Sequence, residues 1–283
     1  MVKKISVFGG TGFIGDAYCD MFEEQCVLIP RSQREPETSD ILYFISTTHN
    51  YNVLDNPYLD IETNLILLIR ILEECKQKYN SDFVFNFVSS WFVYGKTEDL
   101  PANESSECNP RGFYSITKRA AEQLLISYCE TFGIKYRIMR LCNVYGSADQ
   151  KVSKKRNALQ FLTTEVINNR DINLYDEGEN IRDFLHVEDV CRALNLVIYK
   201  APLNELINIG SGTPSKFIEI MSYVKEKVGS TSKFNWVEPP EFHKVVQTKD
   251  IFLDVTKLNN LGFKPKYVIR DGIDLLIKNI QDQ

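Results

Sequence analysis

The sequence of 283 residues lacks several features that would place it in other functional classes. It has no excess of positive charge, because 33 Lys and Arg are outnumbered by 38 Asp and Glu, for a formal net charge of -5. Nucleic acid is therefore not an expected partner. No apolar run approaches the length needed to span a bilayer, so no membrane association is expected. Met1-Val-Lys-Lys leads directly into an expected strand, and we expect no signal peptide.

The cysteines and histidines do not have the spacing of a metal site. The seven cysteines are an odd number without C-x-x-C spacing, and the three histidines are scattered. This usage predicts reduced thiols in a cytoplasmic protein and no metal site. With 43% apolar and 25% charged residues, the chain has an ordinary globular composition and can bury a sizeable core.

What the sequence does contain is a glycine-rich turn between an apolar strand and a helical pattern. The expected strand is Lys4–Phe8, and Gly9-Gly-Thr-Gly-Phe-Ile-Gly15 leads from it into a helix that ends near Phe22. Strand, glycine turn and helix together point helix N-terminal amides at a pyrophosphate. The turn therefore predicts a dinucleotide site, with a merely tight turn as the alternative. Its candidate contacts are Gly9, Thr11, Gly12, Phe13, Ile14 and Gly15.

The second expected strand, 25–29, ends in a basic segment. A dinucleotide fold that selects NAD usually has Asp or Glu at this strand tip, where it accepts from the ribose 2′-hydroxyl. This chain has Arg31, Ser32 and Arg34 there instead. These side chains suit a 2′-phosphate, so NADP(H) is favoured and NAD(H) remains possible. The alternative is a solvated basic loop.

The third expected strand, 41–45, follows after a gap too short for a helical crossover. One strand–helix unit has therefore been trimmed. Ser46, Thr47 and His49 would form the loop over the cofactor, with His49 as a candidate substrate contact; the alternative is a solvated loop histidine.

A helix with a long apolar face is expected over 60–78. Asn64 is polar among these apolar neighbours, and it either satisfies backbone groups or braces Lys118. The apolar surplus on this helix, and on the helix that carries Leu124, predicts a homodimer. Plain core burial is the alternative interpretation.

The stretch from Phe83 to Lys118 carries the candidate chemistry. An apolar strand, 83–88, is followed by Ser89 and Ser90, and Tyr114 and Lys118 lie four residues apart at the start of a helical pattern. Four residues apart on a helix means one face. A free tyrosine has a pKa of about 10, and a nearby ammonium favours its phenolate. Ser90, Tyr114 and Lys118 are therefore candidates for moving a proton to or from an alcohol. Alone, the pair could also be a chance spacing on a solvated helix.

The second half of the chain continues with shorter segments. Expected strands are 136–141, 171–175, 206–209 and 250–254; expected helices are 157–169, 188–200, 217–228 and one from Arg270. Residues 147–156 are polar and suggest a mobile loop or lid. The pattern predicts an α/β, Rossmann-like doubly wound parallel sheet with a smaller C-terminal substrate-binding cap. Residues 1–146, with 186–210 returning, would form the dinucleotide domain; 147–185 and 211–283 would mainly bind substrate.

The motifs occur together in one order. After the glycine turn come Ser89-Ser90, Val93-Tyr-Gly95, Tyr114-x-x-x-Lys118, Arg140-Leu-Cys-Asn-Val-Tyr-Gly146 and Arg182-Asp-Phe-Leu-His-Val-Glu-Asp189. From Lys4 to about Pro265 the chain resembles the extended short-chain dehydrogenase/reductase family, NAD(P)-dependent nucleotide-sugar epimerases and dehydratases. The resemblance implies a nicotinamide cofactor, a nucleoside diphosphate-sugar substrate and a dimer. By position it assigns Ser90, Tyr114 and Lys118 to catalysis. The resemblance suggests Asn143, Asn157 and Arg182 as substrate contacts, and the further candidates are His49, Leu159 and His243.

Two departures from the family pattern restrict the reaction. The dehydratases carry Asp-Glu at the positions of Trp91 and Phe92, and aromatic rings cannot do that acid–base chemistry. Dehydration, decarboxylation and 3,5-epimerisation are therefore disfavoured. The second departure is the diphosphate arginine expected before Asp254-Val-Thr-Lys257. His243 or Lys244 could replace it, which leaves the nucleotide base open.

Three functions remain after these restrictions. An NADPH-dependent 4-keto-sugar reductase is slightly favoured, because Arg31 stands without an acidic residue and the bulky Trp91-Phe92 pair would restrict sugar rotation. An NAD-dependent C4 epimerase is the alternative. A non-catalytic Rossmann binding protein is a remote third, since Ser90, Tyr114 and Lys118 are all present.

Overall fold

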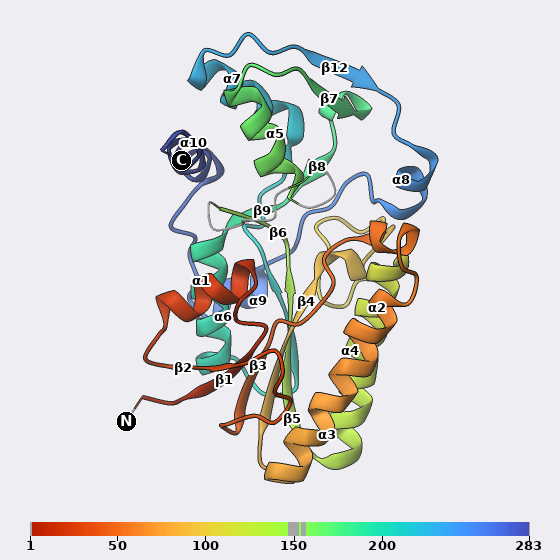
Figure 1. Ribbon diagram of the computed structural model, residues 1–283, viewed down its shortest axis with the longest axis vertical. Coiled ribbons are helices and arrows are strands. Elements are labelled where there is room, and N and C mark those ends of the chain that lie inside the picture. The colour runs from red at the N-terminus through yellow and green to blue at the C-terminus, as the bar shows by residue number, and fades with distance from the viewer. Residues whose placement is uncertain (1, 147–152, 154–156, 283) are drawn as a thin grey trace.

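The computed structural model describes residues 2–146, 153 and 157–282. Its centre is a sheet of six parallel strands in the order β10-β5-β4-β3-β1-β2, which confirms the predicted α/β class (Figure 1). The strands are β1 (Ile5–Phe8), β2 (Cys26–Ile29), β3 (Asp40–Tyr43), β4 (Val84–Ser90), β5 (Lys135–Leu141) and β10 (Glu205–Ile209). The predicted lid falls on 147–156, almost all of which lies outside the described residues.

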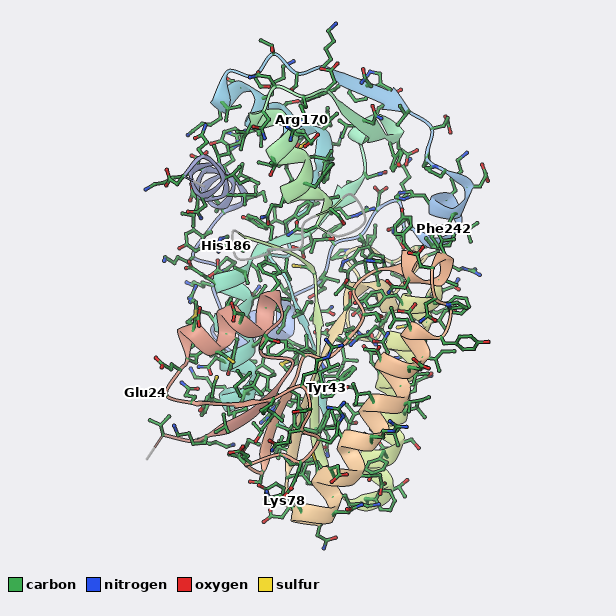
Figure 2. The ribbon with its side chains drawn as sticks, in the orientation of Figure 1. Glu24, Tyr43, Lys78, Arg170, His186 and Phe242 are labelled. Carbon is green, nitrogen blue, oxygen red and sulfur yellow. The ribbon has the colours of Figure 1, made fainter. Side chains whose placement is uncertain are left out.

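Helices cover both faces of this sheet (Figure 1). On one face lie α1 (Phe13–Met21), α6 (Val187–Lys200) and α9 (Thr256–Asn260); on the other lie α3 (Leu67–Tyr79) and α4 (Phe113–Phe132). Because successive strand residues point to opposite faces, Val7 packs in the core with α1 and α6, whereas Phe8 packs in the core with α3 and α4. Figure 2 shows Tyr43 inside the molecule, while Glu24 and Lys78 lie at its periphery.

The connection from β2 to β3 confirms the trimmed crossover. Both strands pair with β1 in parallel, yet the connecting segment 30–39 contains no helix. It crosses the sheet beside β1, where the amides of Glu37 and Thr38 donate to Ser6 Oγ at 2.9 and 2.8 Å. Glu35 also reaches Lys78 of α3 at 2.8 Å, so the segment runs on the α3 face. This leaves β2 as an edge strand.

The helix expected over 60–78 is continuous but irregular. It consists of α2 (Leu59–Ile61), a π-helical turn η2 (Glu62–Ile66) and α3. A π-helical turn adds a residue to one helical repeat and frequently occurs at functional sites. Leu68 and Leu72 are fully buried against the sheet, so part of the apolar stripe is core; Ile61 and Ile66 remain exposed.

A second lobe stands at the C-terminal ends of the sheet strands, at the top of Figure 1. Its helices are α5 (Ala158–Ile167), α7 (Phe217–Val228) and α10 (Ile269–Gln281), and it has its own apolar core. Its strand pairs are β7 (Ile172–Tyr175) with β12 (Phe234–Val237) and β8 (Ile181–Arg182) with β11 (Ser215–Lys216). Between the lobes, β6 (Asn143–Tyr145) pairs with β9 (Phe184–His186). The remaining elements are η1 (Asn50–Leu54), η3 (Trp91–Val93), η4 (Asp176–Gly178) and α8 (Glu241–Val246).

Among the differences from expectation are two strand assignments. The strand expected at 250–254 is wrong, because Ile251 and Leu253 make only isolated bridges, to Arg182 and Ala102. Conversely, β12 was not expected and pairs with β7 in parallel. The division into two domains stays a prediction. Among the described residues, no helix is both long enough and apolar enough to cross a membrane.

Candidate active site

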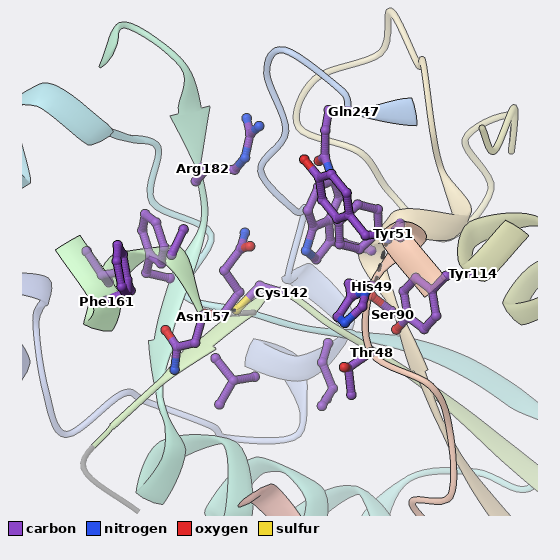
Figure 3. A pocket seen from close by; sticks show the side chains of 18 of the residues that line it. Thr48, His49, Tyr51, Ser90, Tyr114, Cys142, Asn157, Phe161, Arg182 and Gln247 are labelled. Carbon is purple, nitrogen blue, oxygen red and sulfur yellow. Dashed lines mark hydrogen bonds between the residues drawn. The ribbon is translucent and has the colours of Figure 1, made fainter. Parts of the chain in front are cut away.

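A cavity of about 820 Å³ opens where the sheet meets the second lobe. It is bounded on one side by the ends of β1, β3 and β4, and on the other by α5, β7, β8 and α8. Figure 3 shows Thr48, His49, Ser90 and Tyr114 together on one side, with Asn157 and Phe161 opposite them. The ends of parallel strands in doubly wound folds are the usual place for a ligand.

The glycine turn forms one end of this cavity and fits a dinucleotide. Gly9 has φ +80°, a conformation that glycine adopts without strain, and its carbonyl accepts from the Gly12 amide at 3.1 Å. A Cβ on Gly15 would come within 2.4 Å of Gly9 O, so only glycine allows the helix this close to the strand. A Cβ on Gly12 would meet nothing closer than 3.4 Å, because that residue faces the cavity. The amides that begin α1 are thus accessible to a pyrophosphate.

The loop after β3 is held by Asn64 from the π-helical turn. The Asn64 Oδ1 atom accepts from Ser46 Oγ at 3.0 Å and from the Thr47 amide at 2.9 Å. Its Nδ2 donates at 2.9 Å to Thr47 Oγ1 and to Thr117 Oγ1 of α4. Asn64 therefore satisfies a backbone group, as one of the two expectations had it, and it contacts Thr117 and not Lys118.

Ser90, Tyr114 and Lys118 all line the cavity. Ser90 is the last residue of β4, and α4 carries the other two on one face. The Lys118 ammonium donates to Val88 O at 2.8 Å and lies 4.1 Å from the centre of the Phe87 ring. Tyr114 stands edge-on to Phe92, with ring centres 5.6 Å apart.

Burial is the largest influence on the pKa values of Tyr114 and Lys118. It raises the pKa of Tyr114 to about 12, against the opposing effect of the Ser90 hydroxyl, and Asp60 adds to the rise. Burial also lowers the pKa of Lys118 to about 7, with Glu122 opposing. Desolvation disfavours the charged forms of both side chains in the protein without its cofactor, and the expectation that Lys118 together with a cofactor ring makes the phenol acidic stays a prediction. Tyr114 is a neutral phenol at neutral pH.

The aromatic pair expected beside the catalytic residues lines the cavity wall. The Trp91 and Phe92 rings are stacked with centres 3.9 Å apart, directly after Ser90 in η3. Trp91 is buried, and the Arg182 guanidinium lies 5.7 Å from the centre of its ring. An aromatic face and a guanidinium at this distance attract each other.

Cationic groups collect at the second-lobe end of the cavity. The Arg182 guanidinium donates to the carbonyls of Ile181, Thr248 and Lys249, and burial lowers the pKa of Arg182 to about 10. His243 of α8 lies over Tyr175, with ring centres 4.7 Å apart. Burial, and then the Arg182 charge, lower the pKa of His243.

His243 is linked to the first lobe through a tyrosine. A hydrogen bond of 2.7 Å joins Tyr51 Oη and His243 Nδ1. Lys244 instead lies outside the cavity wall and pairs with Glu238 and Glu241 at the surface. Of the two candidates for a substrate cation, the structure therefore brings only His243 to the cavity.

Most of the predicted residues line the cavity. Those that do are Gly9, Gly12, Phe13, Ile14, Gly15, Ser46, Thr47, His49, Ser90, Tyr114, Lys118, Asn143, Asn157, Leu159, Arg182 and His243. The predicted residues that do not line it are Thr11, Arg31, Ser32, Arg34 and Asn64. The Arg34 guanidinium donates to the carbonyls of Arg31 and Gln33 in its own loop.

Tyr51 and Gln247 also line the cavity but were not predicted. Both lie in irregular segments, η1 and the end of α8, where no periodic pattern marks an inward-facing residue. The sequence signal for Tyr51 was that it is an aromatic residue two positions after His49.

Comparison with known proteins agrees with this arrangement. Residues 40–210 match the model of the NAD dependent epimerase/dehydratase family. A putative UDP-glucose 4-epimerase from Methanocaldococcus jannaschii is 30% identical over 226 residues, covering 80% of this chain and 72% of the relative. The family match covers more than half of the 283 residues.

Two solved structures show the same fold. The UDP-glucose 4-epimerase of Thermotoga maritima, determined with UDP-glucose, superposes with a TM-score of 0.88 at 23% identity, over 99% of each chain. The protein RMD from Pseudomonas aeruginosa, determined with NADPH, superposes with a TM-score of 0.87 at 20% identity, also over 99% of each chain. The chain therefore belongs to the NAD-dependent epimerase/dehydratase family, and its fold is that of the extended short-chain dehydrogenases/reductases.

Proposed function

We propose that this protein is an NADPH-dependent reductase of a nucleoside diphosphate 4-keto sugar. The observation that carries the proposal is the composition of the catalytic wall. Ser90, Tyr114 and Lys118 supply proton transfer, whereas Trp91 and Phe92 stand where acid–base chemistry on a neighbouring carbon would need carboxylates. Hydride transfer at a single carbon needs only the first three residues and a nicotinamide.

Reduction consumes one hydride and one proton, and the chain provides the proton. A dinucleotide held by its pyrophosphate at the glycine turn would supply the hydride for the carbonyl carbon from its reduced nicotinamide. Tyr114 gives its phenolic proton to the carbonyl oxygen and later recovers one from solvent, while Ser90 donates a hydrogen bond to the same oxygen. Since burial holds Tyr114 neutral, the phenol already has the proton that reduction requires. Lys118 then stabilises the phenolate that remains.

The aromatic pair would hold the sugar during this step. The stacked rings of Trp91 and Phe92 present an apolar wall next to Tyr114. Such a wall packs against the carbon face of a sugar and excludes water from the reacting carbonyl. It also limits the rotation that an epimerase needs between removal and return of a hydride.

The sugar nucleotide would lie along the second-lobe side of the cavity. Arg182 carries a planar guanidinium suited to phosphate oxygens, and His243 lies near enough for the Arg182 charge to lower its pKa. The remaining proposed substrate contacts are His49, Asn143, Asn157 and Leu159, all on the cavity wall.

The cofactor preference in this proposal depends on the residues that follow β2. Arg31, Ser32 and Arg34 follow the edge strand β2, and Arg31 and Ser32 are exposed to solvent. In support of NADPH, no acidic side chain occupies 30–34. An NAD-dependent C4 epimerase is the second candidate, since the same three catalytic residues serve both reactions.

The deciding experiment identifies the cofactor first and the reaction second. The purified protein is denatured and any released nucleotide is identified; the folded protein is then titrated with NADPH and with NADH. An empty site that prefers NADPH, and oxidation of NADPH on adding a nucleoside diphosphate 4-keto sugar, are the expected results. Stoichiometric bound NAD, together with interconversion of UDP-glucose and UDP-galactose without added cofactor, would establish the epimerase instead.

We also propose that the protein is a homodimer formed through α2, η2 and α4. Large apolar side chains are exposed on these neighbouring elements, and they are Leu59, Ile61, Ile66, Phe113, Ile116, Leu124 and Phe132. A second copy that presents the same face would cover them.

A further inference from the structure

The short helical turn η1 is built around a fully buried asparagine. Asn50 is its first residue and is 0% exposed, so the polar atoms of its amide need bonding partners inside the protein. The Asn50 Oδ1 atom accepts from the backbone amide of Ser115 at 3.1 Å and from Ser115 Oγ at 3.1 Å. Its Nδ2 donates to Ser115 Oγ at 3.0 Å and, over a longer distance of 3.5 Å, to the carbonyl of Val246. Asn50 therefore joins the start of α4 to the end of α8.

The bond to Ser115 caps the helix that carries Tyr114. This helix, α4, begins after Gly112, which has no side chain to cap it, and the amides of its first turn lack partners within the helix. Asn50 Oδ1 accepts from one of these amides and so acts as the cap from a distant segment. A Cβ on Gly112 would lie 2.5 Å from Asn50 Oδ1, so glycine leaves the space that this cap occupies. Tyr114 lies in the same first turn, and its place in the cavity depends on how α4 begins.

The next residue of η1 contacts α8, on the second-lobe side of the cavity. A hydrogen bond of 2.7 Å joins Tyr51 Oη and His243 Nδ1, and the Tyr51 ring packs against Phe242 with ring centres 5.3 Å apart. A hydroxyl both donates and accepts, so this bond is compatible with a neutral and with a charged His243. A histidine that is bonded at Nδ1 keeps its Nε2 available for a ligand.

We propose that η1 positions the groups that act on both ends of the bound sugar nucleotide. Asn50 holds Tyr114 in place through the start of α4, and Tyr51 holds His243 through their hydrogen bond. The inference rests on the proposed function, in which Tyr114 protonates the keto oxygen and His243 meets the diphosphate. Consecutive Cα atoms are about 3.8 Å apart, so one short segment sets the separation of these two groups. Misplacing a reacting group by about 1 Å can lower turnover about 10²-fold, so η1 affects catalysis without contacting the reacting atoms.

Alanine at position 50 tests the effect on Tyr114. Asn50→Ala removes the cap of α4, so the first turn of the helix can shift. We expect kcat for reduction of a nucleoside diphosphate 4-keto sugar to fall by about tenfold, with the NADPH Kd within about twofold of the wild type. Asn208→Ala is the matched control, because Asn208 is also fully buried, donates to the carbonyls of Ala102 and Asp254 at 3.0 Å each, and lies outside the cavity wall. The control should lose stability in urea unfolding and keep the wild-type kcat.

Asn50→Ser is the second variant, for the case that alanine prevents folding. Its smaller polar side chain leaves room for a water that keeps the buried groups bonded. The direct cap is still lost, so its kcat should also fall. A wild-type kcat in either folded variant, or an equal fall of kcat in Asn208→Ala, overturns the role of Asn50.

Tyr51→Phe tests the effect on His243. The ring and its packing against Phe242 remain, and the bond to His243 is lost. We expect KM for the sugar nucleotide to rise by about fivefold, while kcat stays within about twofold of the wild type. Calorimetric titration with a nucleoside diphosphate-glucose should show the same loss of affinity without any reaction. Tyr223→Phe is the matched control, since it removes a hydroxyl that donates to Asp274 at 2.7 Å outside the cavity wall, and it should leave KM unchanged.

Wild-type affinity in Tyr51→Phe, or the same loss of affinity in Tyr223→Phe, overturns the role of Tyr51. The reaction of the wild type is identified first. If the wild type interconverts UDP-glucose and UDP-galactose, the kcat comparison is made on that reaction, because Tyr114 serves both. A wild type that catalyses neither reaction refutes the proposed function and the role of Asn50 with it, while the calorimetric comparison still decides the role of Tyr51. An active wild type with unaffected variants refutes the positioning role alone, so the two failures are distinguishable.

Discussion

At the scale of single residues, burial has opposite consequences for the two partners at the catalytic centre. It raises the pKa of Tyr114 to about 12 and lowers the pKa of Lys118 to about 7, because the charged form of each is poorly solvated. The protein alone therefore favours a neutral phenol. A neutral phenol is the form that gives a proton to a nascent alkoxide, as the proposed reduction requires.

Replacing Tyr114 with phenylalanine tests this role. The change removes one hydroxyl and keeps the ring packed against Phe92, so the fold and the glycine turn should be unaffected. We expect turnover to fall by at least about 10²-fold, because a positioned proton donor contributes that much. Steady-state assays measure turnover, and NADPH fluorescence titration should give an unchanged Kd. Equal turnover in the variant would remove Tyr114 from the mechanism.

His243 gives substrate binding a predicted pH dependence. Burial and the Arg182 charge lower the pKa of His243 in the free protein, whereas a bound diphosphate favours the charged imidazolium. Binding should therefore take up a proton. Affinity is highest when the pH is below the pKa of His243 in the free protein, and falls as the pH rises from there through the higher pKa in the complex.

Calorimetric titration with a nucleoside diphosphate-glucose checks this, since its diphosphate does not itself titrate near neutrality. For the wild type we expect affinity to fall by about tenfold between about pH 5.5 and 8. His243→Asn should bind weakly with little pH dependence, and His243→Arg tightly with little pH dependence. Identical pH profiles for the wild type and His243→Asn would show that this histidine does not contact the diphosphate.

At the scale of elements, two glycines of the turn between β1 and α1 have different roles. Gly15 permits close packing of α1 on β1, and Gly12 leaves open the space in which a pyrophosphate would lie. Gly12 has φ -86°, which any residue adopts, so it is not needed for the backbone itself.

Alanine at these two positions should therefore have different effects. In Gly15→Ala the new Cβ meets Gly9 O at 2.4 Å, so the turn must open; we expect a loss of about 1–3 kcal/mol in the free energy of unfolding and weaker NADPH binding. In Gly12→Ala we expect stability close to wild type and an NADPH Kd at least about tenfold higher. Urea unfolding and NADPH titration measure the two quantities. Equal destabilisation of both variants would contradict this assignment.

The elements also show how far sequence reasoning reaches. β1 and β3 were predictable because each contains a buried apolar run, and the short segment before β3 correctly indicated a missing helix. β12 was missed because it is an edge strand with Trp236 exposed, which leaves no apolar run. At 250–254 the alternation of buried Ile251 and Leu253 has the strand period, but the bridging residues lie in separate segments.

The candidate site also has parts that the sequence predicts and parts that only the fold shows. Tyr114 and Lys118 are local in sequence, so their spacing alone places them on one face of α4. The ion pair of Glu122 on α4 with Arg140 on β5 joins two elements that only the fold brings together, and a single sequence does not show which arginine reaches the carboxylate. Local periodicity predicts elements and helix faces; it does not predict contacts made across the sheet.

At the scale of the whole molecule, the cavity is built from both lobes, and the chain returns to connect them. After α8 the chain passes the first lobe, where Thr248 Oγ1 donates to Gly95 O at 2.8 Å. The Ala102 amide then donates to Phe252 O at 2.9 Å. These bonds fix α8, and with it His243, relative to the strand that ends at Ser90. The proposed diphosphate and catalytic ends of the site are thus held at a set separation.

The exposed apolar face of α2, η2 and α4 leads to the last prediction, at the level of assembly. Phe113, Ile116 and Leu124 recur at spacings that share one face of α4, and Ile116 is 49% exposed. A stable dimer buries about 1,200–2,000 Å² in total, which two long helices packed against their copies can supply. Ile116→Glu/Leu124→Glu would place two carboxylates in that interface.

We expect the wild type to elute as a dimer in size-exclusion chromatography with light scattering, and the double glutamate variant to elute as a folded monomer. Val268→Glu is the matched control, because Val268 is 65% exposed and lies away from α4, at the start of α10. The control should remain a dimer, since burying a carboxylate without a partner is costly only where the surface is covered. A wild type that stays monomeric at micromolar concentration, or a dimeric glutamate variant, would show that this face does not pair with a second copy.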